Sequence, residues 1–222
     1  MPIDDTAPVR ITAFDWVPDF ARGLVRDLRP RWACEEIGLP YATRLISAVK
    51  RPEWFYREQP WGRVPVLEDE GLTLFESGAI LLHLAEKDER LLPRDAEGRA
   101  QVISWLFAAY NSVEPWIFEL SNIALFSADA PWAKLRRDSL IADAGKRLDR
   151  LADALGTRDW LAGGFSVADI AMVTMLRDDC GTGLIADRPR LAAYVERGTA
   201  RGAFKAALAA QLADFKPEPV AA

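Results

Sequence analysis

The pattern of hydrophobic and polar positions changes near residue 90 of the chain. Before it, short apolar segments typical of strands are interleaved with helical segments, whereas helical spacing dominates afterwards. In the first part we expect a strand at 9–14, a helix at 20–37, a strand at 41–46, a short irregular helix at 52–56, strands at 64–67 and 72–75, and a helix at 79–84. The order of elements is therefore βαβ–α–ββα.

This order predicts a thioredoxin-like α/β domain, to which we assign residues 8–87. The segment DERLLPRDAE at 88–97 is polar and has a central proline, as is common in interdomain linkers. Residues 98–215 are then expected to form an all-helical C-terminal domain. The predicted fold class is α/β plus all-α, in two domains.

Two long helices are expected in the second part. The first covers 97–121 and should kink or end at Pro115, because proline has no backbone N–H to donate. Ser166 and Asp169 have the three-residue spacing of a capping box, and we assign them a structural role at a helix start. The second long helix covers 131–155, and the residues expected to face inward are Leu135, Leu140, Ile141, Leu148, Leu151 and Leu155.

Composition narrows the class of protein. Half of the 222 residues are hydrophobic, so a substantial core can form, and the formal net charge is −5. An acidic chain disfavours binding to nucleic acid or to an anionic membrane, and no apolar run is long enough to span a bilayer. The first residues lack the apolar region of a signal peptide. The two cysteines, Cys34 and Cys180, form no C-x-x-C pair, so we expect a cytoplasmic, reduced protein without disulfides or metal thiolates.

Candidate chemistry is concentrated between residues 61 and 87. Pro65 cannot donate to a strand ladder, so it marks an edge, a bulge or a cis peptide turned toward a ligand. Glu76 and Ser77 open the following helix, whose unpaired N–H groups and dipole favour a bound carboxylate. The alternative is that Glu76 and Ser77 only cap that helix, since such caps are common.

Several motifs together resemble the glutathione transferase family. Residues 59–67 read QPWGRVPVL and residues 76–80 read ESGAI, close to the family's N-P-x-G-x-V-P-x-L followed by E-S-x-A-I. Similar family-like segments are WACEEIGLPY at 32–41, FSVADIA at 165–171, RPRLAAYV at 188–195 and RGAFK at 201–205. The resemblance covers roughly residues 10–210. It implies a detoxification enzyme that activates the thiol of glutathione and adds it to a small hydrophobic electrophile.

The resemblance also implies roles for individual residues. Glutathione, a co-substrate rather than a resident cofactor, presents two carboxylates, one ammonium and a thiol. Ser77 matches the position that holds the γ-glutamyl carboxylate, and Glu76 the position that meets the ammonium. Arg63 or Lys50 would meet the glycyl carboxylate. No metal is implied.

Further implications concern the backbone and the assembly. Val64, held before Pro65, would bond the cysteinyl backbone of glutathione as an added strand does. The Val64–Pro65 peptide bond is expected to be cis, a minority state at about 5% of such bonds in folded proteins. A homodimer is expected, with the N-terminal domain of one subunit against the helical domain of the other. The aromatic-rich helix from residue 97 would lie at its two-fold axis.

The group beside the thiol departs from the family pattern. The family usually places Ser, Tyr or Cys at the end of the first strand or the start of the first helix, but residues 16–27 contain none. Counting back from Trp32 puts Leu24 at that position. We hypothesise that backbone N–H groups near 21–24 hold the sulfur, with Arg22 lowering its pKa. The alternative is that these arginines are solvated or pair with neighbouring aspartates.

The missing side chain keeps a second class of function open. A glutathione transferase-like binding or assembly module would bind glutathione without catalysis. A thiol–disulfide reductase would need a reactive cysteine near 18–26, and none is present. Activity assays distinguish these alternatives: a transferase turns over electrophiles, a reductase turns over disulfides, and a binding module turns over neither.

Other residues with chemical potential are assigned to structure. His83 lies among leucines and is expected to be a packed residue, since one histidine cannot build a catalytic triad or a histidine metal cluster. Cys34 is expected to be a small core residue. Asp178, Asp179 and Cys180 resemble metal ligands only by type, and a helix end is the favoured interpretation.

Overall fold

The structure is a computed structural model that describes residues 3–178 and 181–217. Its contacts divide the chain into two units, one made of residues up to 91 together with those from 200 onward, the other of residues 92–199. The expected domain limits, 8–87 and 98–215, stay predictions. By its contacts, the last helix, α9 (Gly202–Asp214), belongs to the first unit rather than to the unit of residues 92–199.

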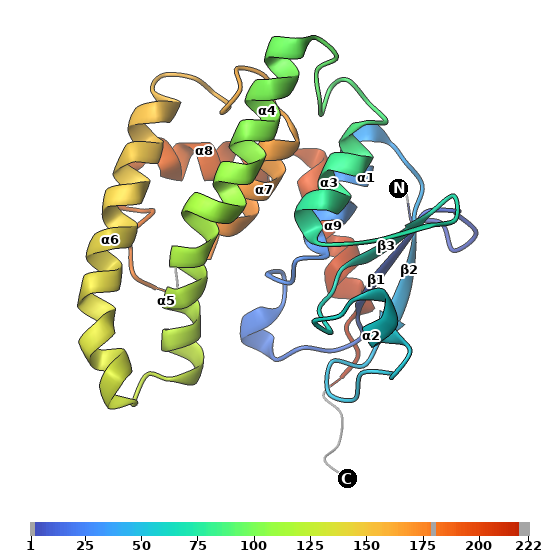
Figure 1. Ribbon diagram of the computed structural model, residues 1–222, viewed down its shortest axis with the longest axis horizontal. Helices are drawn as coiled ribbons and strands as arrows, with labels where there is room; N and C mark the ends of the chain where they lie inside the picture. Colours follow the sequence, from blue (N-terminus) through green and yellow to red (C-terminus); the bar gives the residue numbers. More distant parts are fainter. Residues whose placement is uncertain (1–2, 179–180, 218–222) are drawn as a thin grey trace. The chain divides into compact units, whose positions relative to one another are not determined.

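The first unit contains a four-stranded sheet with strand order β2-β1-β3-β4. Strand β1 (Arg10–Phe14) runs parallel to β2 (Ala42–Ile46) and antiparallel to β3 (Val66–Asp69), which forms a hairpin with β4 (Leu72–Phe75). A parallel pair followed by an antiparallel hairpin is the sheet of the thioredoxin-like domain that the sequence predicts. Figure 1 shows the helices of this unit gathered beside the sheet.

Helix α1 spans Leu28–Ile37, so the expected start at residue 20 is wrong. A 3-10 turn at Asp19–Ala21 comes before the helix. Gly23 then has a φ of +79°, and a positive φ is incompatible with a continuous right-handed helix, so α1 cannot begin before it. Pro30 is the third residue of α1, where the N–H has no intrahelical partner in any case. The proline is therefore compatible with the helix once the helix starts at Leu28.

The remaining elements of the first unit follow the predicted order with shifted limits. Helix α2 is a single turn at Phe55–Glu58, and α3 spans Ser77–Ala85, directly after the hairpin. Buried apolar side chains lie between these elements and the sheet, including Phe55 and Val66.

Helix α9 packs against α1, and the contact includes aromatic rings and buried polar groups. The Trp32 and Phe204 rings meet edge to face with centroids 4.9 Å apart. Arg31 donates to Asp27 at 2.8 Å and to Asp214 at 2.6 Å, and the Gln211 amide donates to Asp27 at 2.9 Å. Burial raises the pKa of Asp27 even though Arg31 and Gln211 favour its charged form.

The second unit begins with one long, interrupted helical run. It consists of α4 (Ala96–Ala108), a π-helical turn η2 (Ala109–Val113) and α5 (Glu114–Phe126). The interruption expected near Pro115 is confirmed. Pro115 is the second residue of α5 and has no N–H for the carbonyl one turn earlier, and the ladder widens to π spacing just before it.

Helix α6 (Pro131–Leu155) has the limits predicted from the sequence. Its buried stripe includes Leu140, Leu148 and Leu151, as expected. The assignment of Leu135 to the core is wrong, because its side chain is 85% exposed. Leu135 precedes Leu140 by five residues, which places it roughly 140° away from the stripe on a helix of 3.6 residues per turn.

Helices α7 (Val167–Leu176) and α8 (Pro189–Ala200) complete the second unit. The capping box at the start of α7 is confirmed, with Ser166 and Asp169 bonded to each other's backbone. Asp169 also accepts hydrogen bonds from the Leu161 N–H at 3.0 Å and from the Tyr194 hydroxyl at 2.8 Å. Among the described residues, no helix combines the length and the apolar character that crossing a membrane requires.

Candidate functional site

The start of α3 has an unusual backbone. Glu76 precedes the helix with φ of +67° and ψ of 115°, a conformation that non-glycine residues rarely adopt and that is concentrated at functional sites. Its carbonyl accepts the Ile80 N–H, but its side chain makes no capping hydrogen bond. The alternative that Glu76 serves as a side-chain cap is therefore wrong.

Ser77, the first residue of α3, is 4% exposed. Its hydroxyl accepts a hydrogen bond from the guanidinium of Arg29 at 3.2 Å. Arg29 belongs to α1 and is itself buried. A cation held against the hydroxyl, in addition to the helix dipole, makes this end of α3 favourable for a carboxylate. Sequence reasoning missed Arg29, since its contact with Ser77 joins residues 48 positions apart.

The turn before β3 leaves one stretch of backbone outside the sheet. The Val64–Pro65 peptide bond is cis, which confirms the prediction. Strand β3 begins only at Val66, and within the described residues the backbone N–H and C=O of Val64 take no hydrogen-bond partner. An extended ligand could therefore pair with Val64 as an added strand would.

A cavity of 460 Å³ joins these features. It is lined by Arg26, Gln59, Trp61, Arg63, Val64, Pro65, Glu76 and Ser77. Five of the predicted site residues are thus brought together in one cavity of the first unit. Because its lining holds two guanidinium groups against one carboxylate, the cavity favours a ligand with more negative than positive groups.

Three lining residues were not predicted. Gln59 and Trp61 lie within the motif at 59–67, and the Gln59 side chain accepts the Trp61 N–H at 2.7 Å, which shapes the turn. The next residue, Gly62, has φ of +64°, and a β-carbon there would come within 2.6 Å of the Tyr56 ring. Arg26 is part of the arginine-rich segment, and only its place in the fold shows that it faces the cavity.

The chain is similar in sequence to proteins of one known family. The family model described as "Glutathione S-transferase, N-terminal domain" matches residues 20–86. Glutathione S-transferase F10 of Arabidopsis thaliana is 30% identical over 175 residues, which cover 72% of this chain and 80% of that relative. The chain belongs to the glutathione transferase family. Glutathione S-transferase tcpG of Claviceps purpurea is 33% identical over 95 residues, but these span only 36% of this chain and 38% of that relative.

Solved structures of glutathione transferases share the fold. A glutathione transferase from Burkholderia graminis, solved with two glutathione molecules bound per subunit, is 28% identical, with a TM-score of 0.79. The match covers 90% of this chain and 87% of that structure. The predicted fold class, a thioredoxin-like domain followed by an all-helical domain, is confirmed.

Two of the predicted site residues, Arg22 and Lys50, lie outside the cavity lining. Arg22 is exposed and pairs with Asp19 at 3.2 Å, which is the arrangement that the alternative interpretation expected. Its guanidinium also lies over the Phe215 ring, 5.8 Å from the centroid. Lys50 is exposed as well. Their roles in catalysis and binding stay predictions.

The backbone near residues 21–24 is largely committed to local turns. The N–H of Ala21 donates to Pro18, that of Arg22 to Asp19 and that of Leu24 to Ala21. These three donors would have to leave their turns to hold the glutathione sulfur, and that role stays a prediction. Each already donates to a carbonyl three residues earlier in the chain.

His83, which the neighbouring leucines predict to be a packed residue, is partly buried and lies against a buried carboxylate. Its Nε2 lies 2.7 Å from a carboxylate oxygen of Asp69, which also accepts from Lys87 at 2.7 Å. Cys34 is buried, as expected, and burial strongly raises the pKa of its thiol, so it is not a ready thiolate.

No metal centre accompanies the site in the part of the chain that the structure describes, where no group of three or more His, Cys, Asp or Glu side chains could hold an ion. Asp178, a residue of the candidate ligand set, accepts a hydrogen bond from the Ser121 hydroxyl at 2.9 Å, just beyond the end of α7. Asp179 and Cys180 lie outside the described residues.

Proposed function

We propose that this glutathione transferase family member binds glutathione in the cavity at the start of α3 and adds its thiol to a small hydrophobic electrophile. The observation that carries the proposal is the buried Ser77 hydroxyl at the helix N-terminus, with Arg29 donating to it at 3.2 Å. The helix dipole, the unpaired backbone N–H groups at the helix start and the Arg29 guanidinium together form a strong site for one carboxylate.

The charges of the cavity support glutathione as the ligand. Glutathione carries two carboxylates and one ammonium at neutral pH, and the lining carries two guanidinium groups and one carboxylate. Ser77 would hold the γ-glutamyl carboxylate and Glu76 the ammonium. Arg63 is favoured over Lys50 for the glycyl carboxylate because only Arg63 lines the cavity.

The backbone of Val64 would hold the middle of the tripeptide. An extended cysteinyl residue can donate one hydrogen bond to the Val64 carbonyl and accept one from its N–H, as in strand addition. Two such bonds fix the direction of the cysteinyl side chain, and so position the thiol.

Catalysis would require the thiol to ionise before it attacks. The thiolate sulfur would form a bond to the electrophilic carbon, while a leaving group departs with its electron pair or an activated double bond takes up a proton. A nearby cation lowers a thiol pKa. Arg26 lines the cavity and is therefore a better candidate for this electrostatic role than Arg22, which pairs with Asp19.

Calorimetry tests the binding site. Ser77→Ala should weaken glutathione binding by roughly tenfold or more, since a hydrogen bond to a charged group is worth about 1.5–3 kcal/mol. Thr73→Ala, an exposed hydroxyl on the neighbouring strand β4, is the matched control and should leave the affinity unchanged. Equal affinities in wild type and Ser77→Ala, both folded, would reject the assignment.

A second candidate function is glutathione binding without catalysis. It is favoured by the absence of Ser, Tyr and Cys from 16–27 and by the commitment of the Ala21, Arg22 and Leu24 N–H groups to turns. A panel of aromatic halides, enones and epoxides separates the two functions. Conjugate formation faster than in free solution supports the transferase, whereas saturable binding with no conjugate from any of them supports the binding module.

We also propose a homodimer that uses the aromatic-rich run from α4 to α5, in a cytoplasmic setting. Exposed aromatic rings on this run, Phe107 at 56% and Phe126 at 70%, support an association surface. Sedimentation at micromolar concentration tests the claim, and a monomer would reject it. No nucleic-acid or membrane partner is proposed.

A further inference from the structure

The amide of Gln211 lies against both sequence neighbours of an arginine that lines the cavity at the start of α3. Gln211 belongs to α9, and its side chain is completely buried. Its Nε2 donates to the Val25 carbonyl at 3.0 Å and to a carboxylate oxygen of Asp27 at 2.9 Å. Between these two residues is Arg26, a residue of the cavity lining. One side chain of α9 therefore fixes the residues on both sides of Arg26.

The orientation of the Gln211 amide is decided by its partners. The Val25 carbonyl can only accept, and Asp27 already accepts from Arg31 at 2.8 Å through its other oxygen, so the NH2 end of the amide must face them. The Gln211 Oε1 is buried and takes no hydrogen-bond partner within the part of the chain that the structure describes. An unpaired buried carbonyl lowers stability, which an apolar side chain of the same length would avoid. Packing alone therefore does not account for a glutamine at this position.

Other contacts already attach α9 to α1. The Trp32 ring meets the Phe204 ring, and Arg31 pairs with Asp214. These contacts involve residues within α1, whereas the two hydrogen bonds of Gln211 reach the turn just before the helix begins. The glutamine thus acts on the turn that carries the cavity arginine.

The residues after α9 meet an earlier part of the same β1–α1 loop. The Lys216 N–H donates to the Asp15 carbonyl at 2.7 Å, and its Nζ lies 3.2 Å from the Asp15 carboxylate. The Arg22 guanidinium lies over the Phe215 ring, 5.8 Å from its centroid. The loop is therefore attached to the C-terminal segment at its start, in its middle and, through the glutamine, at its end.

We propose that Gln211 is a positioning residue that holds Arg26 in place for the thiolate of bound glutathione. The role rests on the proposed function and deepens it, because the cation would take over the task of the Ser, Tyr or Cys that residues 16–27 lack. An arginine whose neighbours are already fixed loses less conformational freedom when it meets the thiolate. Charges that are fixed before the reaction also stabilise a developing charge more strongly than mobile ones.

The test is a double-mutant cycle in the full chain, measured by the thiolate absorbance of bound glutathione as a function of pH. Arg26→Gln should raise the pKa of the bound thiol by about one pH unit, because a nearby cation stabilises the thiolate. Gln211→Met keeps the length of the side chain but cannot donate, and should raise that pKa by a smaller amount. In the Arg26→Gln background, Gln211→Met should change it no further. A residue that only stabilises the fold would not show this dependence on Arg26.

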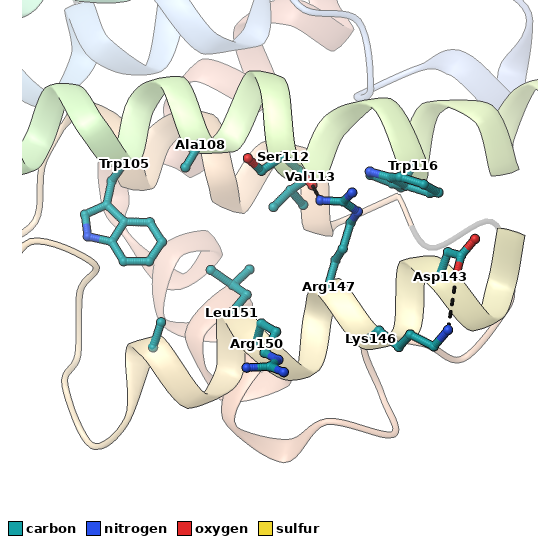
Figure 2. A pocket seen from close by; sticks show the side chains of 11 residues that line it. Trp105, Ala108, Ser112, Val113, Trp116, Asp143, Lys146, Arg147, Arg150 and Leu151 are labelled. Carbon is teal, nitrogen blue, oxygen red and sulfur yellow. Dashed lines mark hydrogen bonds and ion pairs between the residues drawn. The ribbon is translucent and has the colours of Figure 1, made fainter.

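Matched controls test for effects of charge and of side-chain type. Arg150→Gln removes the same charge from an exposed residue of the cleft between the α4–η2–α5 run and α6 (Figure 2). That cleft shares no lining residue with the cavity at the start of α3, so the thiol pKa should not change. Gln101→Met makes the same substitution at an exposed glutamine of α4 and should also have no effect. Gln211→Asn, which withdraws the amide by one methylene, serves as the second variant if Gln211→Met does not fold.

Hydrogen exchange of the ligand-free protein adds a measurement that does not need glutathione. The Leu28 N–H donates to the Val25 carbonyl at 3.1 Å and so reports on the turn before α1. Gln211→Met should speed the exchange of this N–H roughly tenfold, because two hydrogen bonds that hold the turn are lost. Exchange of the Ile80 N–H, in the first turn of α3, should stay unchanged.

The outcomes separate the positioning role from the proposed function. If the wild type binds glutathione, an unchanged thiol pKa in Arg26→Gln or in Gln211→Met overturns the positioning role and leaves glutathione binding intact. Equal increases from Gln211→Met in both backgrounds overturn it as well. If the wild type binds no glutathione, the proposed function is rejected. Faster exchange of the Leu28 N–H in Gln211→Met then still supports the attachment of the turn by the glutamine, and unchanged exchange overturns it.

Discussion

Asp69 of the first unit and Asp169 of the second are both buried carboxylates, with 3% and 0% of their surface exposed. Their partners differ. Asp69 accepts from Lys87 and lies against His83, whereas Asp169 accepts only from neutral donors, two backbone N–H groups and two hydroxyls. Burial raises the pKa of Asp169 in spite of these hydrogen bonds. Burial would also raise the pKa of Asp69, but its hydrogen bonds from Lys87 and His83 outweigh burial and lower it.

The comparison shows that the depth of a carboxylate does not decide which protonation state the fold prefers. A cation within hydrogen-bond distance favours the charged form, whereas neutral donors satisfy the oxygens without balancing the charge. The two aspartates should therefore respond differently to substitution and to pH.

Removing Asp169 should have the largest effect. Asp169→Ala leaves buried N–H and O–H donors without an acceptor, and we expect a loss of about 3 kcal/mol in the free energy of unfolding. Ser166→Ala removes one hydroxyl of the same capping box and should cost about 1 kcal/mol. Urea unfolding followed by tryptophan fluorescence measures both. Equal losses in the free energy of unfolding would show that Asp169 contributes only its hydrogen bonds within the capping box.

Replacing Asp69 should have a smaller effect. Asp69→Asn removes a charged partner from Lys87 and His83, which should reduce the free energy of unfolding by about 2 kcal/mol. Glu70→Gln changes an exposed carboxylate next to it, and should alter stability by less than about 0.5 kcal/mol. If the two variants unfold at the same urea concentration, the Asp69 cluster contributes nothing to stability.

The smallest and sharpest test is the sign of the pH dependence. Asp69 has a lowered pKa, so its contribution is present above the ordinary value of 3.8 and is lost as the pH falls through the folded-state pKa. Asp169 has a raised pKa, so its contribution is complete below 3.8 and is lost as the pH rises through the folded-state pKa. Neither slope can exceed about 1.4 kcal/mol per pH unit for one proton.

The measurement is the difference in unfolding free energy between wild type and each Asp→Asn variant. The difference for Asp69→Asn should shrink toward low pH, and that for Asp169→Asn should shrink as the pH rises from about 4 toward 7. Slopes of the same sign in both would contradict the opposite pKa directions.

The sequence predicts local features better than it predicts partners. The spacing of Ser166 and Asp169 predicts their capping box, and the resemblance of the motif around Pro65 to the glutathione transferase family predicts the cis bond there. Both signals lie within a few consecutive residues. The Tyr194 hydroxyl on Asp169 comes from another helix, and no local pattern indicates it.

The candidate site shows the same division. Val64, Pro65, Glu76 and Ser77 lie in short motifs and line one cavity, as expected. Arg29 reaches Ser77 from α1, a contact that only the fold brings about.

One misassignment has a plain physical reason. Leu135 is apolar but lies off the buried stripe of α6, so composition without helical phase is misleading there. The partner of His83 could not be predicted from its leucine neighbours, because only the fold brings its side chain to Asp69 at the end of β3.

The first unit is closed by a helix that lies far along the chain from the rest of it. Arg31 and Asp214, which pair at 2.6 Å, are 183 positions apart in sequence. Until α9 is synthesised, Trp32 lacks the Phe204 ring and Arg31 lacks the Asp214 carboxylate, whereas residues 92–199 have already been synthesised. Residues 92–199 are therefore synthesised before α9, and the unit that contains the sheet has all of its elements only once α9 has been added.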